Sequence, residues 1–159
     1  MIKSLSSSII LLVILLITCC ASSEKANVKV SLEVVKSEID SWLNLMPGVS
    51  PGKFHLTGEV TMQNLSDEGI NNISLDNITV YSSEDVIYSF KPYFIHKMEG
   101  DNFNLNTGMD KVFAFGMEEG LKIDKRLDKN KIINITLHFV YDKGSYSYSV
   151  DSVEVEEAY

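Results

Sequence analysis

Hydrophobic and polar residues alternate along most of the chain after residue 27. The clearest stretch is 54–63, where Phe54, Leu56, Val60 and Met62 fall on one side and polar residues on the other. Successive side chains of a β-strand point to opposite faces, so this period of two predicts half-buried strands. Weaker forms of the pattern predict further strands at 28–35, 73–80, 86–90, 112–117, 133–141 and 146–155.

Several positions interrupt the alternation and predict local irregularities. Gly58 takes an inward place in the clearest strand, which indicates a bulge or a close approach of another backbone. The phase of the pattern shifts at 76–77 and again at 151–152, and a one-residue bulge explains each shift. Residues 36–46 have partly helical spacing but stop at Pro47-Gly48, so we expect them to extend the first strand.

Polar, turn-forming segments separate the strands and predict their connections. Residues 64–69 and 82–85 are rich in Asn, Ser, Asp and Gly, which favour chain reversal. The second of these turns predicts a hairpin, and the turn at 142–145 predicts another. We expect an open loop at 99–108, an exposed connection at 118–131, and an acidic carboxyl end in solvent.

This pattern predicts an all-β domain over residues 27–159, preceded by a short linker at 21–26. Seven to eight short strands with almost no helix favour an immunoglobulin-like or fibronectin-III-like β-sandwich. An up-and-down barrel is the alternative, but the uneven loop lengths suit crossovers between two sheets better.

Residues 1–20 have the features of a signal peptide. Lys3 supplies a positive charge, and the apolar run from Ile9 to Ile17 is much shorter than the roughly 20 residues that span a bilayer. The run ends at the adjacent Cys19 and Cys20, followed by small residues.

This ending resembles the lipobox of bacterial lipoproteins, in which a Leu and small residues precede the cysteine that becomes the lipidated amino terminus. The resemblance implies acylation of Cys19 or Cys20. If Cys19 is acylated, Thr18 stands where Gly, Ala or Ser is usual. If Cys20 is acylated, Cys19 fills that small-residue position. The absence of Asp after either cysteine then implies the outer membrane, with the domain at the cell envelope. The alternative is free secretion after cleavage near 21–23.

A second resemblance concerns the β-domain. Residues 60–66 followed by 73–75 look like the strand-Asn-turn-strand pattern of Ig-like sandwiches in secreted bacterial proteins, and 127–131 is similar to a stretch before their penultimate strand. The resemblance implies a fold and adhesion, inhibitory or accessory binding roles. It carries over no functional residue.

Composition excludes several functions. The net charge is −8 at pH 7, and no basic stripe with interleaved aromatic residues offsets it, so we expect no nucleic-acid partner. The same charge disfavours binding to anionic lipid, so we expect membrane association through the lipidated cysteine. No cysteine follows Cys20, which leaves the domain without an internal disulfide.

The sequence offers little catalytic chemistry. The three histidines are scattered, and no nucleophile elbow, P-loop or metal-ligand spacing is present, so we expect neither an enzyme nor a metal or cofactor. Residues 101–106 offer several oxygen ligands, but Phe103 and Leu105 stand where a calcium loop of the EF type needs oxygen, and no bidentate Glu follows at the right distance. The alternative is a secreted inhibitor or enzyme whose site forms around His55 and His138.

Aromatic residues give the remaining candidate surface: Tyr93, Phe94, Tyr146 and Tyr148. Tyr-rich strand ends bind partners well because the ring gives a large contact area at small entropic cost. The competing interpretation is core packing. The sequence therefore predicts a lipid-anchored, non-enzymatic Ig-like module that binds a protein or glycan at the cell envelope.

Overall fold

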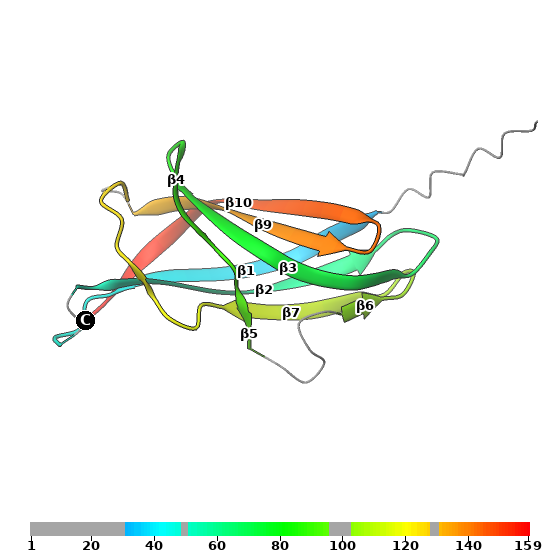
Figure 1. Cartoon of the computed structure of the whole chain (residues 1–159), viewed down its shortest axis with the longest axis horizontal. Helices are drawn as coiled ribbons and strands as arrows, with labels where there is room; N and C mark the ends of the chain where they lie inside the picture. Colours follow the sequence, from blue (N-terminus) through cyan, green and yellow to red (C-terminus); the bar gives the residue numbers. More distant parts are fainter. Residues whose placement is uncertain (1–30, 49–50, 96–102, 128–130) are drawn as a thin grey trace, which may run out of the picture.

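The computed structural model describes residues 31–48, 51–95, 103–127 and 131–159, and these residues form an all-β domain without a helix. Figure 1 shows the strands curling around one interior. The strands are β1 (Leu32–Asn44), β2 (Lys53–Asn64), β3 (Ile70–Ser82), β4 (Asp85–Phe90), β5 (Tyr93–Phe94), β6 (Phe103–Leu105), β7 (Asp110–Gly116), β8 (Leu121–Lys122), β9 (Ile132–Tyr141) and β10 (Gly144–Ala158).

The strands form one continuous sheet in the order β4-β3-β9-β10-β1-β2-β7-β5, which curls into two packed layers. β10 belongs to both layers. Its first part pairs antiparallel with β9, and its last part pairs parallel with β1, from Ser41 opposite Val155 onward. The register shifts between Val150 and Val153, where Ser152 has a φ of 59°. This bulge marks the bend between the two layers.

The curl is completed on the opposite side by the chain itself. β4 and β5 stand at the two ends of the strand order, yet only residues 91–92 separate them in sequence. Figure 1 shows this stretch crossing in front of the interior from one layer to the other. The short strands β6 and β8 add to β3 and β2.

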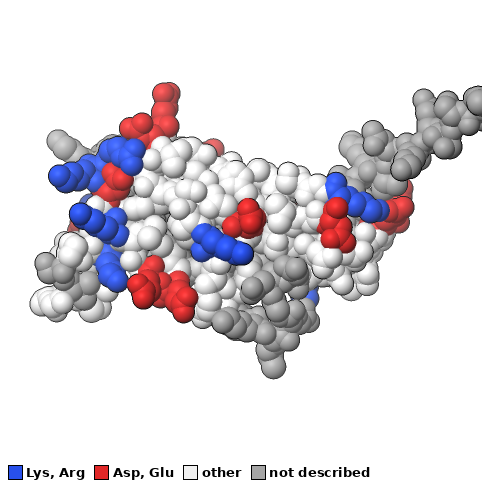
Figure 2. Space-filling view, in the orientation of Figure 1, with Lys and Arg blue, Asp and Glu red and all other residues white. Residues whose placement is uncertain are grey.

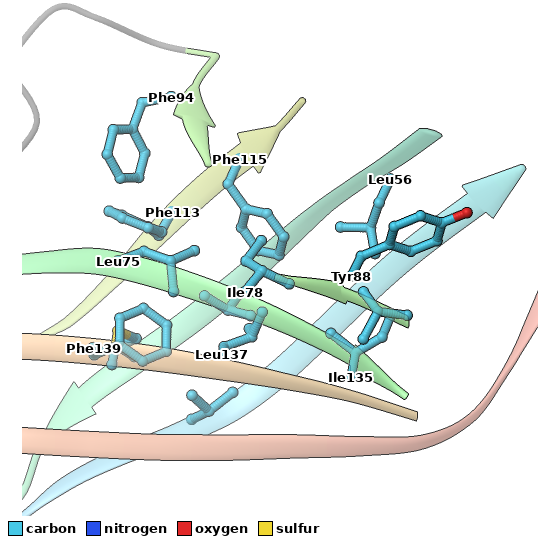
Figure 3. Packing of buried hydrophobic residues seen from close by; sticks show 14 of the residues in the cluster. Leu56, Leu75, Ile78, Tyr88, Phe94, Phe113, Phe115, Ile135, Leu137 and Phe139 are labelled. Atoms are coloured by element: carbon cyan, nitrogen blue, oxygen red, sulfur yellow. The ribbon is translucent and has the colours of Figure 1, made fainter. Parts of the chain in front are cut away.

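The core lies between the layers and consists of alternate residues from the long strands. Fully buried side chains include Phe54, Leu56, Val60 and Met62 of β2. Three aromatic rings contact one another in series across the interior. Phe94 packs edge-on against Phe113, with ring centroids 4.7 Å apart, and Phe113 packs against Phe139, with centroids 6.1 Å apart. Figure 3 shows these rings between aliphatic side chains of both layers.

The irregularities predicted from the sequence are confirmed. Residues 36–44 continue β1 in extended form. The register of β3 on β9 shifts between Leu75 and Asn77, and β10 has the bulge described above. At Gly58, a Cβ atom would lie 2.7 Å from the ring of Phe115 and 3.1 Å from the carbonyl oxygen of Glu38, so a close approach explains this glycine.

Three expectations were incomplete or wrong. The loop prediction for 99–108 missed β6, and the connection at 118–131 contains β8. That connection is also held to the core, because the Tyr88 hydroxyl donates to the Lys122 carbonyl at 3.1 Å and accepts from the Asp124 N–H at 2.8 Å. The strand predicted at 146–155 is longer and runs from Gly144 to Ala158, and the glutamates of the carboxyl end are exposed as expected. Residues 28–30 lie outside the described residues.

Asn64 fixes the turn that follows β2. The side chain is fully buried, and its amide nitrogen donates to the carbonyls of Glu68 at 2.8 Å and Leu105 at 2.9 Å. Its oxygen accepts from the N–H of Ser66 at 2.9 Å and from the Ser66 hydroxyl. One amide group therefore joins the turn to β6, 41 residues further along the chain.

Candidate interaction face

The outward side of the layer β4-β3-β9-β10 carries uncharged polar residues. The inward positions of its two central strands, such as Ile78, Val80, Ile135 and Leu137, are fully buried, so the residues between them point outward. We call the outward set the neutral face. Its polar members are Asn77, Thr79, Tyr81, Ser89, Asn134, Thr136, His138, Ser147 and Ser149. The exposed apolar residues Val86, Ile132 and Val140 lie on the same side, and Thr79 is only 8% exposed.

Strand register brings these residues into rows. Thr79 is paired with Ser89 on one side and with Thr136 on the other, and Thr136 is paired with Ser149. One row of hydroxyl groups therefore crosses four strands. The adjacent row contains Asn77, His138 and Ser147.

A chain of side-chain hydrogen bonds joins the two rows. Asn77 exchanges hydrogen bonds with Ser89, at 3.0 and 3.2 Å, and donates to Thr79 at 3.1 Å. His138 lies in the middle of the chain, with Nε2 3.2 Å from the Thr79 hydroxyl and Nδ1 3.1 Å from the Ser147 hydroxyl. These bonds fix the side chains as an ordered array of donors and acceptors.

The outward side of the other layer has a different character. On β1 and β2 it presents Glu33, Lys36, Glu38, Asp40, Lys53 and Glu59. We call this the charged face. On the side of the molecule drawn in Figure 2, charged residues gather mainly near the two ends and leave broad uncharged areas between them.

Two hollows of the described residues lie away from the neutral face. A cavity of about 20 Å³, lined by residues that include Ser66, Ile70 and Tyr141, has room for about one water molecule. A shallow hollow lies over residues 122–126. Neither contains a residue of the neutral face. Within the described ranges, no cluster of three or more His, Cys, Asp or Glu residues could hold a metal ion.

The four aromatic residues predicted as a binding surface are not brought together on one surface. Phe94 is only 7% exposed and belongs to the core, whereas its neighbour Tyr93 points outward. Tyr146 and Tyr148 point inward from β10 and are half-buried. The Tyr146 hydroxyl accepts from the Val34 N–H at 3.4 Å.

Both tyrosines of β10 reach β1 with their hydroxyl groups. The Tyr148 hydroxyl lies 3.1 Å from the hydroxyl of Ser37 on β1, beside the contact of Tyr146 with the same strand. Side chains thus connect β10 to the part of β1 with which it shares no backbone ladder. The Tyr146 hydroxyl is partly buried, and the resulting desolvation is the main reason that its pKa is raised. Binding by these four residues stays a prediction.

The two histidines of the alternative site lie on opposite outer faces. His138 is part of the neutral face, and His55 is on the charged face, where its ring stacks on Trp42 with centroids 5.2 Å apart. Desolvation by partial burial lowers the pKa of His55, and the positive charge of the nearby Lys53 lowers it further. The structure therefore does not assemble one site from both histidines.

Cys19 and Cys20 lie outside the described residues. In the part of the chain that the structure covers, no helix is long and apolar enough to cross a membrane.

Fold and face together define an all-β domain made of one curled sheet with two chemically different outer faces. No protein-family model and no curated protein matches the chain. Among solved structures, the chain is similar to one titled "Structure of Iho670 Flagellar-like Filament", with a TM-score of 0.34 and 10% sequence identity, over 94% of each chain. A TM-score this low establishes no common fold.

Proposed function

We propose that this protein is a lipid-anchored, extracytoplasmic Ig-like module, without enzymatic activity, that binds a partner of the cell envelope through its neutral face. The anchoring half of the proposal depends on the leader that ends at Cys19 and Cys20. The binding half depends on one observation, the contrast between an ordered, uncharged outer face and a charged one on a protein of net charge −8.

The strand order supports an Ig-like arrangement of the variable type. One layer is β1-β2-β7-β5, which corresponds to strands A, B, E and D of that arrangement. The other is β4-β3-β9-β10, which corresponds to C′, C, F and G. The chain lacks the inter-sheet disulfide and the buried core Trp of antibody domains, since Trp42 stands on an outer face.

Desolvation favours the neutral face as the binding surface. Carboxylates and ammonium groups lose much hydration free energy when a partner covers them, whereas hydrogen-bonded hydroxyl and amide groups lose far less. Covering the neutral face therefore costs less than covering the charged face. The side-chain hydrogen bonds also order the surface in advance, which reduces the entropic cost of binding.

The intact mass of the protein extracted from bacterial membranes tests the anchor. Expression of the full chain with its own leader is expected to yield a chain that starts at Cys19 or Cys20 with added diacylglycerol and acyl mass. An unmodified chain that starts near Ser22 or Glu24 would show that the anchor is wrong.

A charge placed on one face tests the binding surface. In Thr136→Glu, a carboxylate stands in the middle of the neutral face, and Thr61→Glu is the matched control on the charged face. We expect the first variant to lose retention on isolated cell envelopes and the second to keep it, with equal thermal stability. Equal retention of both variants would exclude the neutral face.

A further inference from the structure

One edge of β10 has no neighbouring strand among the described residues. β10 pairs with β9 from Gly144 to Val150, but its parallel pairing with β1 begins only at Val155. The other edge of residues 144–150 is therefore open, and such an edge offers backbone N–H and C=O groups to a further strand. We infer that this open edge pairs with the same edge of a second copy of the chain, in an antiparallel dimer centred on Ser147.

The backbone groups at the open edge belong to three serines. The two-residue turn at 142–143 is closed by Tyr141 and Gly144, which form a hydrogen-bonded pair in a hairpin of this kind. In an antiparallel ladder every second residue bonds to the same neighbour, so the even-numbered residues from Gly144 onward bond to β9. The N–H and C=O groups of Ser145, Ser147 and Ser149 therefore point to the open side.

The open edge of β10 lacks the features that protect most strand edges. Charged side chains, prolines and bulges usually prevent one edge from pairing with another. Residues 144–150 have the sequence Gly-Ser-Tyr-Ser-Tyr-Ser-Val, with neither a charge nor a proline, and the bulge of β10 comes only after them. This stretch is therefore suited to pair with another strand.

Two other strand edges of the described domain carry such protection. The part of β1 that faces away from β2 has a register shift between Val34 and Lys36, and the Val34 N–H is already bonded to the Tyr146 hydroxyl at 3.4 Å. β4, at one end of the strand order, begins with Asp85 and is soon followed by Pro92. The contrast indicates that the edge of β10 is the one used for association.

The sequence of the open edge selects a second copy as the occupant, because it reads the same in both directions around Ser147. An antiparallel pair with its two-fold axis at Ser147 places Ser145 opposite Ser149 of the other copy, and Tyr146 opposite Tyr148. A two-fold interface requires this self-complementarity. The serines then exchange backbone hydrogen bonds, and the cross-strand tyrosine pairs stabilise the ladder further.

The charged residues beside the edge fit the same register. Lys143 precedes the edge and Asp151 follows it, each four residues from Ser147. The two-fold axis therefore places Lys143 of each copy opposite Asp151 of the other, and moving the axis by one residue separates these charges. Lys143 also contacts Glu68 of its own chain at the surface, but an ammonium group has three donors and can bond to both carboxylates.

The dimer joins the layers β4-β3-β9-β10 of two copies into one sheet. Because the two-fold axis stands perpendicular to this sheet, both neutral faces lie on the same side of it. The dimer does not depend on the binding function proposed above, and it would present two neutral faces to one partner.

Cysteine crosslinking in cells that express the full chain tests the register. In Ser147→Cys the two cysteines face each other with Cα atoms about 5.5 Å apart, a separation that a disulfide can bridge. Mild oxidation is expected to yield a covalent dimer on a non-reducing gel. The wild type is the control for Cys19 and Cys20 and is expected to yield none.

Two neighbouring serines provide matched controls. In Ser145→Cys or Ser149→Cys alone, the cysteine is about 14 Å along the strand from its equivalent in the other copy, so neither variant is expected to form a dimer. The chain that carries both substitutions is expected to form one, because each cysteine then faces the other type across the axis.

A charge reversal tests the same register independently. In the Ser147→Cys chain, Asp151→Lys turns two opposite-charge pairs into like-charge pairs, and we expect crosslinking about fivefold slower. The further substitution Lys143→Glu exchanges the two charges and is expected to restore the rate.

Three outcomes would overturn the inference. They are no dimer from Ser147→Cys, as much dimer from Ser145→Cys alone, or an unchanged rate with Asp151→Lys. Each of them leaves the proposed function in place, because Thr136→Glu tests envelope retention by the neutral face separately.

Discussion

The Asn64→Ala substitution removes the amide that joins the turn after β2 to β6. One hydrogen-bond partner of Asn64 stays satisfied in this variant, because the Glu68 carbonyl still accepts a hydrogen bond from the Ser66 hydroxyl at 2.9 Å. The Leu105 carbonyl and the Ser66 N–H lose the bonds that Asn64 makes to them. An unsatisfied buried polar group costs about 1 to 3 kcal/mol. We therefore expect a loss of about 2 to 4 kcal/mol in the free energy of unfolding.

Urea unfolding followed by tryptophan fluorescence measures this loss, because the single Trp42 reports on β1. Asn71→Ala is the matched control: its side chain is exposed, and a change within about 0.5 kcal/mol is expected. Asn64→Asp keeps the shape but turns an oxygen toward the carbonyls of Glu68 and Leu105, so we expect it to be no more stable than Asn64→Ala. A loss below about 1 kcal/mol for Asn64→Ala, with an unchanged fold, would refute the assignment of Asn64 as a buried hydrogen-bonding centre.

Three other substitutions test separate parts of the fold. Gly58→Ala places a methyl group against Phe115, and we expect a loss of about 1 to 3 kcal/mol in urea unfolding; an unchanged midpoint would contradict the close approach. Tyr88→Phe removes both hydrogen bonds to the 122–124 connection, and a loss of about 1 to 2 kcal/mol is expected, with faster proteolysis of that connection; wild-type behaviour would show that the connection is held by other contacts. His55 has a folded-state pKa below its ordinary value, so its contribution to stability is complete above pH 6.5 and is lost as the pH falls through the folded pKa. The urea midpoint is therefore expected to fall more between pH 7.5 and 5.5 for the wild type than for His55→Gln, and equal falls would count against the desolvation of His55.

The sequence predicted the long strands because each has one side in the core. In β2, burial of every second apolar residue produces the alternation directly, and a phase shift reveals a bulge, as at Asn77. Strands of two or three residues, such as β6 and β8, are too short to produce a period. The parallel pairing of β10 with β1 was missed because Val155 is the one buried residue among exposed glutamates.

The neutral face was harder to find than the fold. Ser, Thr and Asn are ordinary residues on the outer side of any strand, so their presence alone carries no signal. Only the register shows that Thr79 and Thr136 are neighbours, although they stand far apart in the sequence. Tyr93 and Phe94 are adjacent residues of one strand, so their side chains point to opposite faces. The alternation of hydrophobic and polar residues did not reveal this strand, because it is only two residues long.

The dual pairing of β10 determines when the domain can fold. Among the strands of the described residues, β10 is the last in sequence, yet it stands in the middle of the strand order, between β9 and β1. Until the ribosome has added these residues, the two layers have no common strand. The earlier strands then remain two separate groups with exposed edges. The pairings of β10 with β9 and with β1 therefore form only after this strand has been made, and they join the two layers.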